Sequence, residues 1–128
     1  MKAFKAVLAS LLVLGISSFL SITASAQLIN KKSLLKDLND SEGMTLSPKQ
    51  KKDYEEINAR TANSLLDMDK KKLSKDDRDK EVDRIFDRRD KEIEGIFGIG
   101  DKVEDTRKAY RRKTRGLRLK IKAAKLVL

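Results

Sequence analysis

The chain has 128 residues, of which 39% are charged and only 5% are aromatic, with 30 basic and 20 acidic side chains. It contains neither cysteine nor histidine, which excludes disulfide bonds, a lipid-anchored lipoprotein, the usual zinc ligands and a cysteine nucleophile. Because the commonest general base at neutral pH is missing too, we expect a charged helical protein that is not an enzyme and holds no cofactor or metal.

Residues 1–26 have the layout of a secretory signal peptide. Two lysines make the start positive, residues 6–22 are almost wholly apolar or small, and Ala24-Ser25-Ala26 supplies small residues for cleavage. The alternative is an uncleaved membrane anchor, since this stretch could just cross a bilayer. Serines dilute the apolar stretch, so we expect cleavage after Ala26 and a periplasmic or secreted protein.

Positive charge gathers at the C-terminal end of the chain. From Arg107 onward there are ten basic residues and no acidic one, whereas residues 27–106 hold 18 basic and 20 acidic residues. After cleavage the chain would carry 28 bases and 20 acids, a net charge of +8. We infer that anionic partners would meet this end.

Residues 27–45 predict a short helix, with three leucines at helical spacing, followed by a polar linker. Asp37, Asn39 and Ser41 alternate as in a calcium-binding loop. Glu42 stands where such a loop needs its turn glycine, so the linker is the favoured interpretation.

The segment Leu46-Ser47-Pro48-Lys49-Gln50 predicts the start of a long helix. Ser47 can cap the helix, proline suits its first turn, and Gln50 can reach back to complete a capping box. The following apolar side chains recur at spacings of three and four, so we predict a helix from about residue 48 to about residue 72.

Ser74 predicts the start of a second helix, which has three faces. One face is apolar, a neighbouring stripe is acidic, and the third is basic. The basic stripe consists of Lys80, Arg84, Arg88 and Lys91. The charged stripes either dock on complementary helices, within the chain or across a dimer, or face a client protein.

Arg78 and Arg89 lie near the apolar side of this helix. We expect the aliphatic part of each side chain to cover apolar surface while the charged end stays in water.

Asp101 and Glu104 predict a third helix, with heptad-like apolar spacing that continues to Leu128. Residues 117–122 alternate as in a strand, but no other segment offers a strand to pair with, so a helix is favoured. We therefore predict an all-α fold, a thin hairpin of three to four amphipathic helices, paired in a curved dimer. Its parts would be residues 27–45, a helical domain at 46–115, and a basic tail or helix extension at 116–128.

The Leu46-Ser47-Pro48-Lys49-Gln50 segment resembles the hallmark Leu-Thr-x-x-Gln motif of the Spy/CpxP family, with serine in place of threonine. The similarity in rhythm covers residues 46–113. Leu73-Ser74 matches only half of a second copy of the motif, and residues 99–103 match none of it. The resemblance implies a periplasmic, thin, curved all-α dimer in which Leu46, Ser47 and Gln50 set a helix start. Members of this family act as ATP-independent holdase chaperones or as inhibitors in envelope-stress sensing, and hold clients on a concave face.

Three functions follow as hypotheses. The first is an envelope-stress holdase chaperone or stress-sensing adaptor for unfolded or acidic client proteins. The second is a binder of anionic envelope surfaces, such as a membrane, through the cationic C-terminal helix. The third is a passive interaction protein whose homodimer serves another partner. Nucleic acid is not an expected partner, because the compartment is wrong and stacking aromatics are few. The candidate client-binding or anion-binding residues are Lys80, Arg84, Arg88, Lys91, Arg107, Arg111, Arg112, Arg115, Arg118 and Lys122.

Overall fold

The computed structural model describes residues 27–98 and 101–127, so the predicted signal peptide at residues 1–26 lies outside the described residues. The described part has four helices and two short strands, and the predicted all-α class is confirmed. In chain order the elements are β1 (Leu28–Asn30), α2 (Lys31–Asn39), α3 (Pro48–Lys70), α4 (Lys75–Glu94), α5 (Asp101–Ala123) and β2 (Lys125–Val127).

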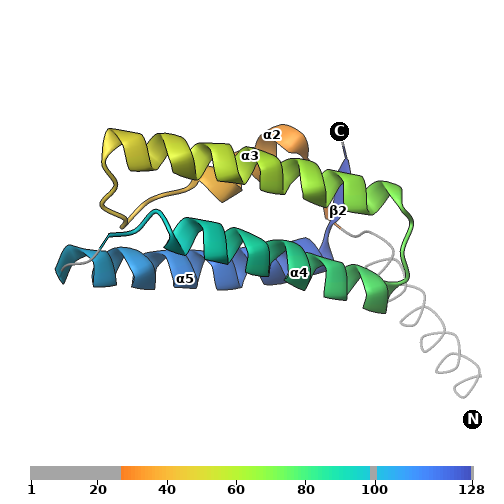
Figure 1. The fold of residues 1–128 in the computed structure, drawn as a ribbon. Coiled ribbons are helices and arrows are strands. Elements are labelled where there is room, and N and C mark those ends of the chain that lie inside the picture. Colours follow the sequence, from red (N-terminus) through yellow and green to blue (C-terminus); the bar gives the residue numbers. More distant parts are fainter. Residues whose placement is uncertain (1–26, 99–100, 128) are drawn as a thin grey trace, which may run out of the picture.

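The three long helices run in alternating directions along one elongated body (Figure 1). Helices α3 and α4 form an antiparallel hairpin, α5 lies along α4, and the short helix α2 packs against α3. The predicted boundary at residue 115 falls inside α5, which continues without a break to Ala123. Residues 116–123 are therefore an extension of this helix.

Helix α3 begins with the capping box that the sequence predicts. Ser47 Oγ accepts a hydrogen bond from the Gln50 backbone at 3.1 Å, and Gln50 Oε1 accepts one from the Ser47 backbone at 2.8 Å. The Gln50 side chain also donates to the Ile96 carbonyl at 3.0 Å, just beyond the end of α4. Leu46 packs against the neighbouring core. These residues therefore fix both the start of α3 and its contact with the end of α4.

Two clusters of buried side chains make up the core. The larger one contains aliphatic residues and Phe86 from all four helices and both strands. The smaller one combines three aromatic residues with two isoleucines, and the Tyr110 ring meets Tyr54 and Phe97 edge to face, with centroids 6.5 and 5.8 Å apart. Each fully buried side chain of this size stabilises the fold by about 1.5–3 kcal/mol, so packing along the helices holds the chain together.

The prediction that the last helix continues to Leu128 is wrong beyond Ala123. Residues 125–127 form β2, which pairs in parallel with β1 in the register Ile29↔Leu126. Ile29 and Leu126 are both buried in the larger cluster. The predicted helix at residues 117–122 is present, and it ends where the apolar side chain of Leu126 can reach the core beside β1.

An ion pair between Asp69 and Arg78 closes the end of the molecule where α3 turns into α4. Arg78 donates to both carboxylate oxygens of Asp69, at 2.6 and 3.0 Å. The same guanidinium donates to the carbonyls of Ile121 and Lys122 at the end of α5. The expectation that the charged end of Arg78 stays in water is wrong, because its side chain is only 15% exposed and caps a helix.

Candidate functional site

A seam of ion pairs joins α4 to α5, and it uses the acidic stripe that the sequence predicts on α4. Asp83 pairs with Lys122 at 2.8 Å, and Glu94 pairs with Arg107 at 2.8 Å and with Arg111 at 3.7 Å. The acidic stripe thus docks on a complementary helix within the chain, which is one of the two predicted alternatives.

Arg118 is the centre of this seam. Its guanidinium lies 3.3 Å from Asp83, 3.1 Å from Asp87 and 3.1 Å from Asp90, and it also covers the Phe86 ring at 5.5 Å. The hydrogen bond from Lys122, together with the charges of Lys122 and Arg118, lowers the pKa of Asp83 below its usual range.

Four of the ten predicted binding residues therefore hold the chain's own helices together. These are Arg107, Arg111, Arg118 and Lys122. Their charges are balanced by four carboxylates of α4, so the seam offers a partner little net charge. The other six predicted binding residues lie outside the seam.

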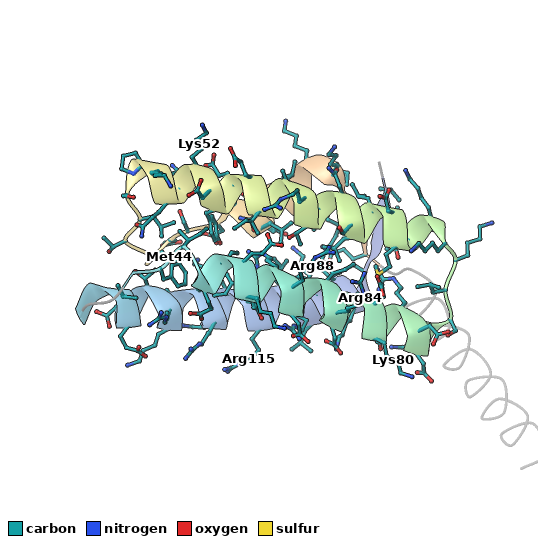
Figure 2. The ribbon with its side chains drawn as sticks, in the orientation of Figure 1. Met44, Lys52, Lys80, Arg84, Arg88 and Arg115 are labelled. Atoms are coloured by element: carbon teal, nitrogen blue, oxygen red, sulfur yellow. The ribbon has the colours of Figure 1, made fainter. Side chains whose placement is uncertain are left out.

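The four residues of the predicted basic stripe on α4 are exposed, and Figure 2 shows Arg88 between α3 and α4. Arg84 pairs with Glu81 one turn earlier and lowers the pKa of that carboxyl, and Arg88 donates to Ser64 Oγ at 3.0 Å. Lys80 and Lys91 form no ion pair with any residue that the structure describes.

Arg112 and Arg115 are the two remaining basic residues, and they lie on α5. Both side chains are exposed, and neither forms an ion pair within residues 27–98 and 101–127. Figure 2 shows Arg115 and Lys80 pointing away from α3 on the same side of the molecule, whereas Lys52 of α3 points the opposite way. We call Lys80, Arg84, Arg88, Lys91, Arg112 and Arg115 the basic surface.

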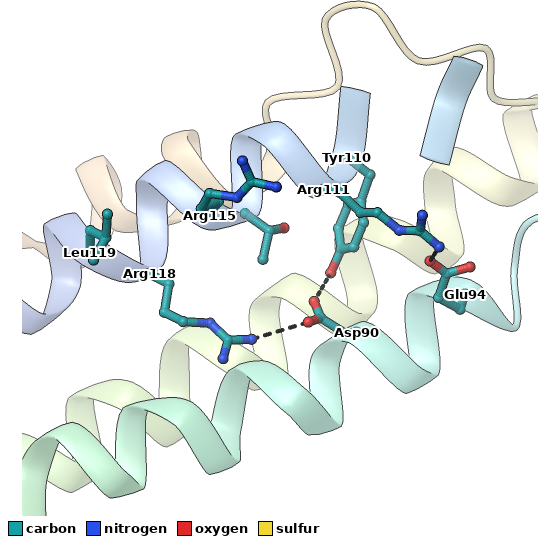
Figure 3. Close-up of a pocket in the computed structure, with 8 residues that line it drawn as sticks. Asp90, Glu94, Tyr110, Arg111, Arg115, Arg118 and Leu119 are labelled. Carbon is teal, nitrogen blue, oxygen red and sulfur yellow. Dashed lines mark hydrogen bonds and ion pairs between the residues drawn. The ribbon is translucent and has the colours of Figure 1, made fainter. Parts of the chain in front are cut away.

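A shallow groove of about 520 Å³ lies between α4 and α5 beside this surface (Figure 3). Its lining includes the buried side chains of Tyr110 and Thr114 and the exposed side chain of Leu119, which is 63% exposed. Three arginines of α5 stand around the groove at successive helical turns, and Asp90 and Glu94 of α4 close the other side. The groove therefore combines apolar surface with charged groups.

Tyr110 connects the groove to the seam. Its hydroxyl donates to Asp90 Oδ1 at 2.5 Å, and Asp90 Oδ2 accepts from Arg118. Burial, reinforced by the hydrogen bond to Asp90, raises the pKa of Tyr110 far above its ordinary value of 10.0. The hydroxyl therefore stays protonated and donates to Asp90, and this hydrogen bond joins the two helices that form the groove.

Behind the groove lies Arg89, whose role the sequence analysis missed. The expectation that its charged end stays in water is wrong, because the residue is only 3% exposed. It donates to Asn58 Oδ1 at 2.8 Å, to Thr114 Oγ1 at 3.1 Å and to the Leu38 carbonyl at 3.1 Å. One buried side chain of α4 thereby binds α2, α3 and α5.

The charge of Arg89 is balanced by dipoles and aromatic rings. The Leu38 carbonyl belongs to the C-terminal turn of α2, which carries partial negative charge. The guanidinium carbon also lies 5.2 to 5.9 Å from the ring centroids of Tyr54, Phe86 and Tyr110. A basic residue on an otherwise apolar helix face was the signal that the sequence offered for this network.

No protein-family model, curated protein or solved structure matches the chain. In the part of the chain that the structure describes, no cluster of three or more acidic side chains is placed to hold a metal ion. None of the helices described is both long and apolar enough to span a bilayer.

Proposed function

We propose that the exported chain is an ATP-independent holdase chaperone or stress-sensing adaptor that binds unfolded or acidic proteins on its basic surface. The observation that carries this proposal is the distribution of ion pairs. In the seam, acidic side chains of α4 pair with basic side chains of α5. Four exposed basic residues form no ion pair among the described residues, namely Lys80, Lys91, Arg112 and Arg115.

The physical chemistry of this surface suits weak and reversible binding. Exposed charges attract an anionic chain over the screening length of about 8–10 Å at physiological salt. A single exposed ion pair contributes only about 0.2–1 kcal/mol, so a client is held by several weak contacts and leaves without an energy source. Binding of this kind must weaken as salt is added.

The resemblance to the Spy/CpxP family supports the same proposal. The capping box at Ser47 and Gln50 and the long helices are what that resemblance implies.

The proposal also includes a homodimer. Sedimentation equilibrium of the processed chain would show a dimer, and a stable folded monomer at micromolar concentration would contradict it.

The test is suppression of client aggregation by the processed chain, followed by light scattering at increasing salt. The double variant Lys80→Gln and Lys91→Gln removes two charges from the basic surface while keeping good helix formers. The matched control, Lys51→Gln and Lys52→Gln, removes two exposed charges from α3, where Lys52 points away from α4. We expect the first pair to weaken suppression and the control to leave it unchanged. Equal loss from both pairs, or no suppression at any salt, would refute the proposal.

Binding to anionic envelope surfaces is the second candidate, and the exposed trio Arg112, Arg115 and Leu119 on α5 favours it. Arginines beside an exposed leucine suit the boundary between lipid headgroups and acyl chains. Sedimentation with anionic and neutral vesicles separates the two functions. Binding to anionic vesicles without suppression of client aggregation would favour the membrane, and negligible binding to both vesicles would end this alternative.

A further inference from the structure

We propose that the groove between α4 and α5 is a peptide-binding site for short segments in which an acidic residue stands two positions from an apolar one. This inference rests on the proposed function, and it names the groove as the place where an acidic segment of a client protein binds.

The lining of the groove has one positive charge that is not balanced, so it can accept one carboxylate. Its lining holds three arginines and two acids, a net charge of +1. Asp90 is occupied by Tyr110 and Arg118, and Glu94 is occupied by Arg107 and Arg111. Arg115 lines the same groove and has no carboxylate partner among the described residues. An incoming carboxylate that pairs with Arg115 would bring the lining to neutrality.

The apolar part of the site is Leu119, one helical turn after Arg115. Large apolar side chains at this exposure are unusual in the described chain, where only Leu28 matches its 63%. Leu119 lines the same groove as Tyr110 and Thr114, and Figure 3 shows it at one end of the groove. An apolar side chain placed there would remove Leu119 from water, which a bound anion alone would not do.

The spacing between these two groups defines the segment. Side chains four apart on a helix lie roughly 5–6 Å apart. In an extended peptide, residues i and i+2 point to the same side and are about 6.6 Å apart, at about 3.3 Å per residue. An acidic side chain on Arg115 therefore brings the residue two positions away from it onto Leu119. The segment that fits has an acidic and an apolar residue separated by any one residue.

The test is fluorescence anisotropy of three labelled peptides on the full processed chain, with the central residues Glu-Ser-Leu, Gln-Ser-Leu and Glu-Ser-Ser. We expect Glu-Ser-Leu to bind at least about fivefold more tightly than either of the others, which corresponds to ~1 kcal/mol. Arg115→Gln and Leu119→Ser should each remove that preference. Lys52→Gln and Leu28→Ser are matched controls, because they remove an equal charge and an equally exposed leucine elsewhere.

Several results would overturn the site. These are equal binding of all three peptides, no binding of Glu-Ser-Leu, full competition by acetate at the concentration of the peptide, or equal losses from Arg115→Gln and Lys52→Gln. The aggregation assay is run on the same variants. Peptide binding without suppression of aggregation would refute the proposed function and leave the site standing. Suppression that persists while the peptide preference is absent would refute the site alone.

Discussion

Asp69 and Arg78 form a bidentate pair that also binds the last strand, because Asp69 Oδ2 accepts a hydrogen bond from the backbone of Leu126 at 2.9 Å. Both side chains are largely buried, at 11% and 15% exposure. The pair thus connects the end of α3, the start of α4, the end of α5 and β2. Two residues, one on each side of the turn between α3 and α4, thus hold four elements together at this end of the molecule.

The first prediction concerns this pair. Asp69→Asn should lower the free energy of unfolding by about 3 kcal/mol, because Arg78 would lose its charged partner while remaining largely buried. Urea unfolding followed by circular dichroism measures the effect. Asp67→Asn is the matched control, since its pair with Lys70 is exposed and should contribute less than about 1 kcal/mol. Equal losses from the two variants would contradict the role of the Asp69–Arg78 pair.

A second prediction follows from the buried guanidinium of Arg89. Arg89→Ala should lower the free energy of unfolding by about 4 kcal/mol, because it leaves a cavity and deprives the buried Asn58 Oδ1 of its donor. Arg89→Lys should lose less, since it keeps the charge and some donors. The adjacent exposed residue Arg88 provides the comparison, and Arg88→Ala should change stability by less than about 1 kcal/mol. Thermal melts that rank Arg88→Ala as the most damaging variant would be incompatible with this network.

Acid should weaken the seam between α4 and α5. The pKa of Asp83 is lowered in the folded chain, so this carboxylate adds stability above its unfolded pKa of about 3.9 and loses it as the pH falls below about 4. Urea unfolding at a series of pH values measures this loss. Because Asp83 is partly exposed, its share should stay below about 1 kcal/mol. Asp83→Asn should show a shallower loss in acid, and an unchanged acid profile would argue against the seam.

Alkali should act through Tyr110. Its pKa is raised by burial, so the folded chain holds the neutral phenol while the unfolded chain ionises near pH 10. The free energy of unfolding is therefore retained below about pH 10 and falls as the pH rises further. Tyr110→Phe should be less sensitive to alkali, although it loses about 1 kcal/mol at neutral pH with the hydrogen bond to Asp90. Tyrosinate absorbance that appears only on unfolding would support this account. Ionisation of every tyrosine near pH 10 in the folded chain would refute it.

Local signals in the sequence predicted the long helices well. The cap at Ser47, the proline after it and the periodic apolar residues place α3 within two residues of its observed end, and Ser74 caps α4 as expected. These features depend on neighbours three or four positions away, so one sequence displays them. The docking of the acidic stripe was also among the predicted alternatives, because oppositely charged stripes on two helices suggest contact.

Features that depend on distant residues were not predicted. Each strand has only three residues, too few to show an alternating pattern, and each finds its partner at the far end of the described chain. Arg89 was interpreted as a surface side chain because its acceptors come from three other helices. The groove has the same origin, since α4 supplies its acids and α5 its arginines.

The parallel pairing of β1 with β2 brings the two ends of the described fold side by side. A loop that contains all four helices must close before this pair forms, and the entropy of closing it is the largest in the molecule. The strands should therefore join last when the chain refolds and separate first under a pulling force. A short linker could therefore join the chain end beside β1 to the chain end beside β2. With new termini opened in the turn between α3 and α4, the circularly permuted protein should keep the same core.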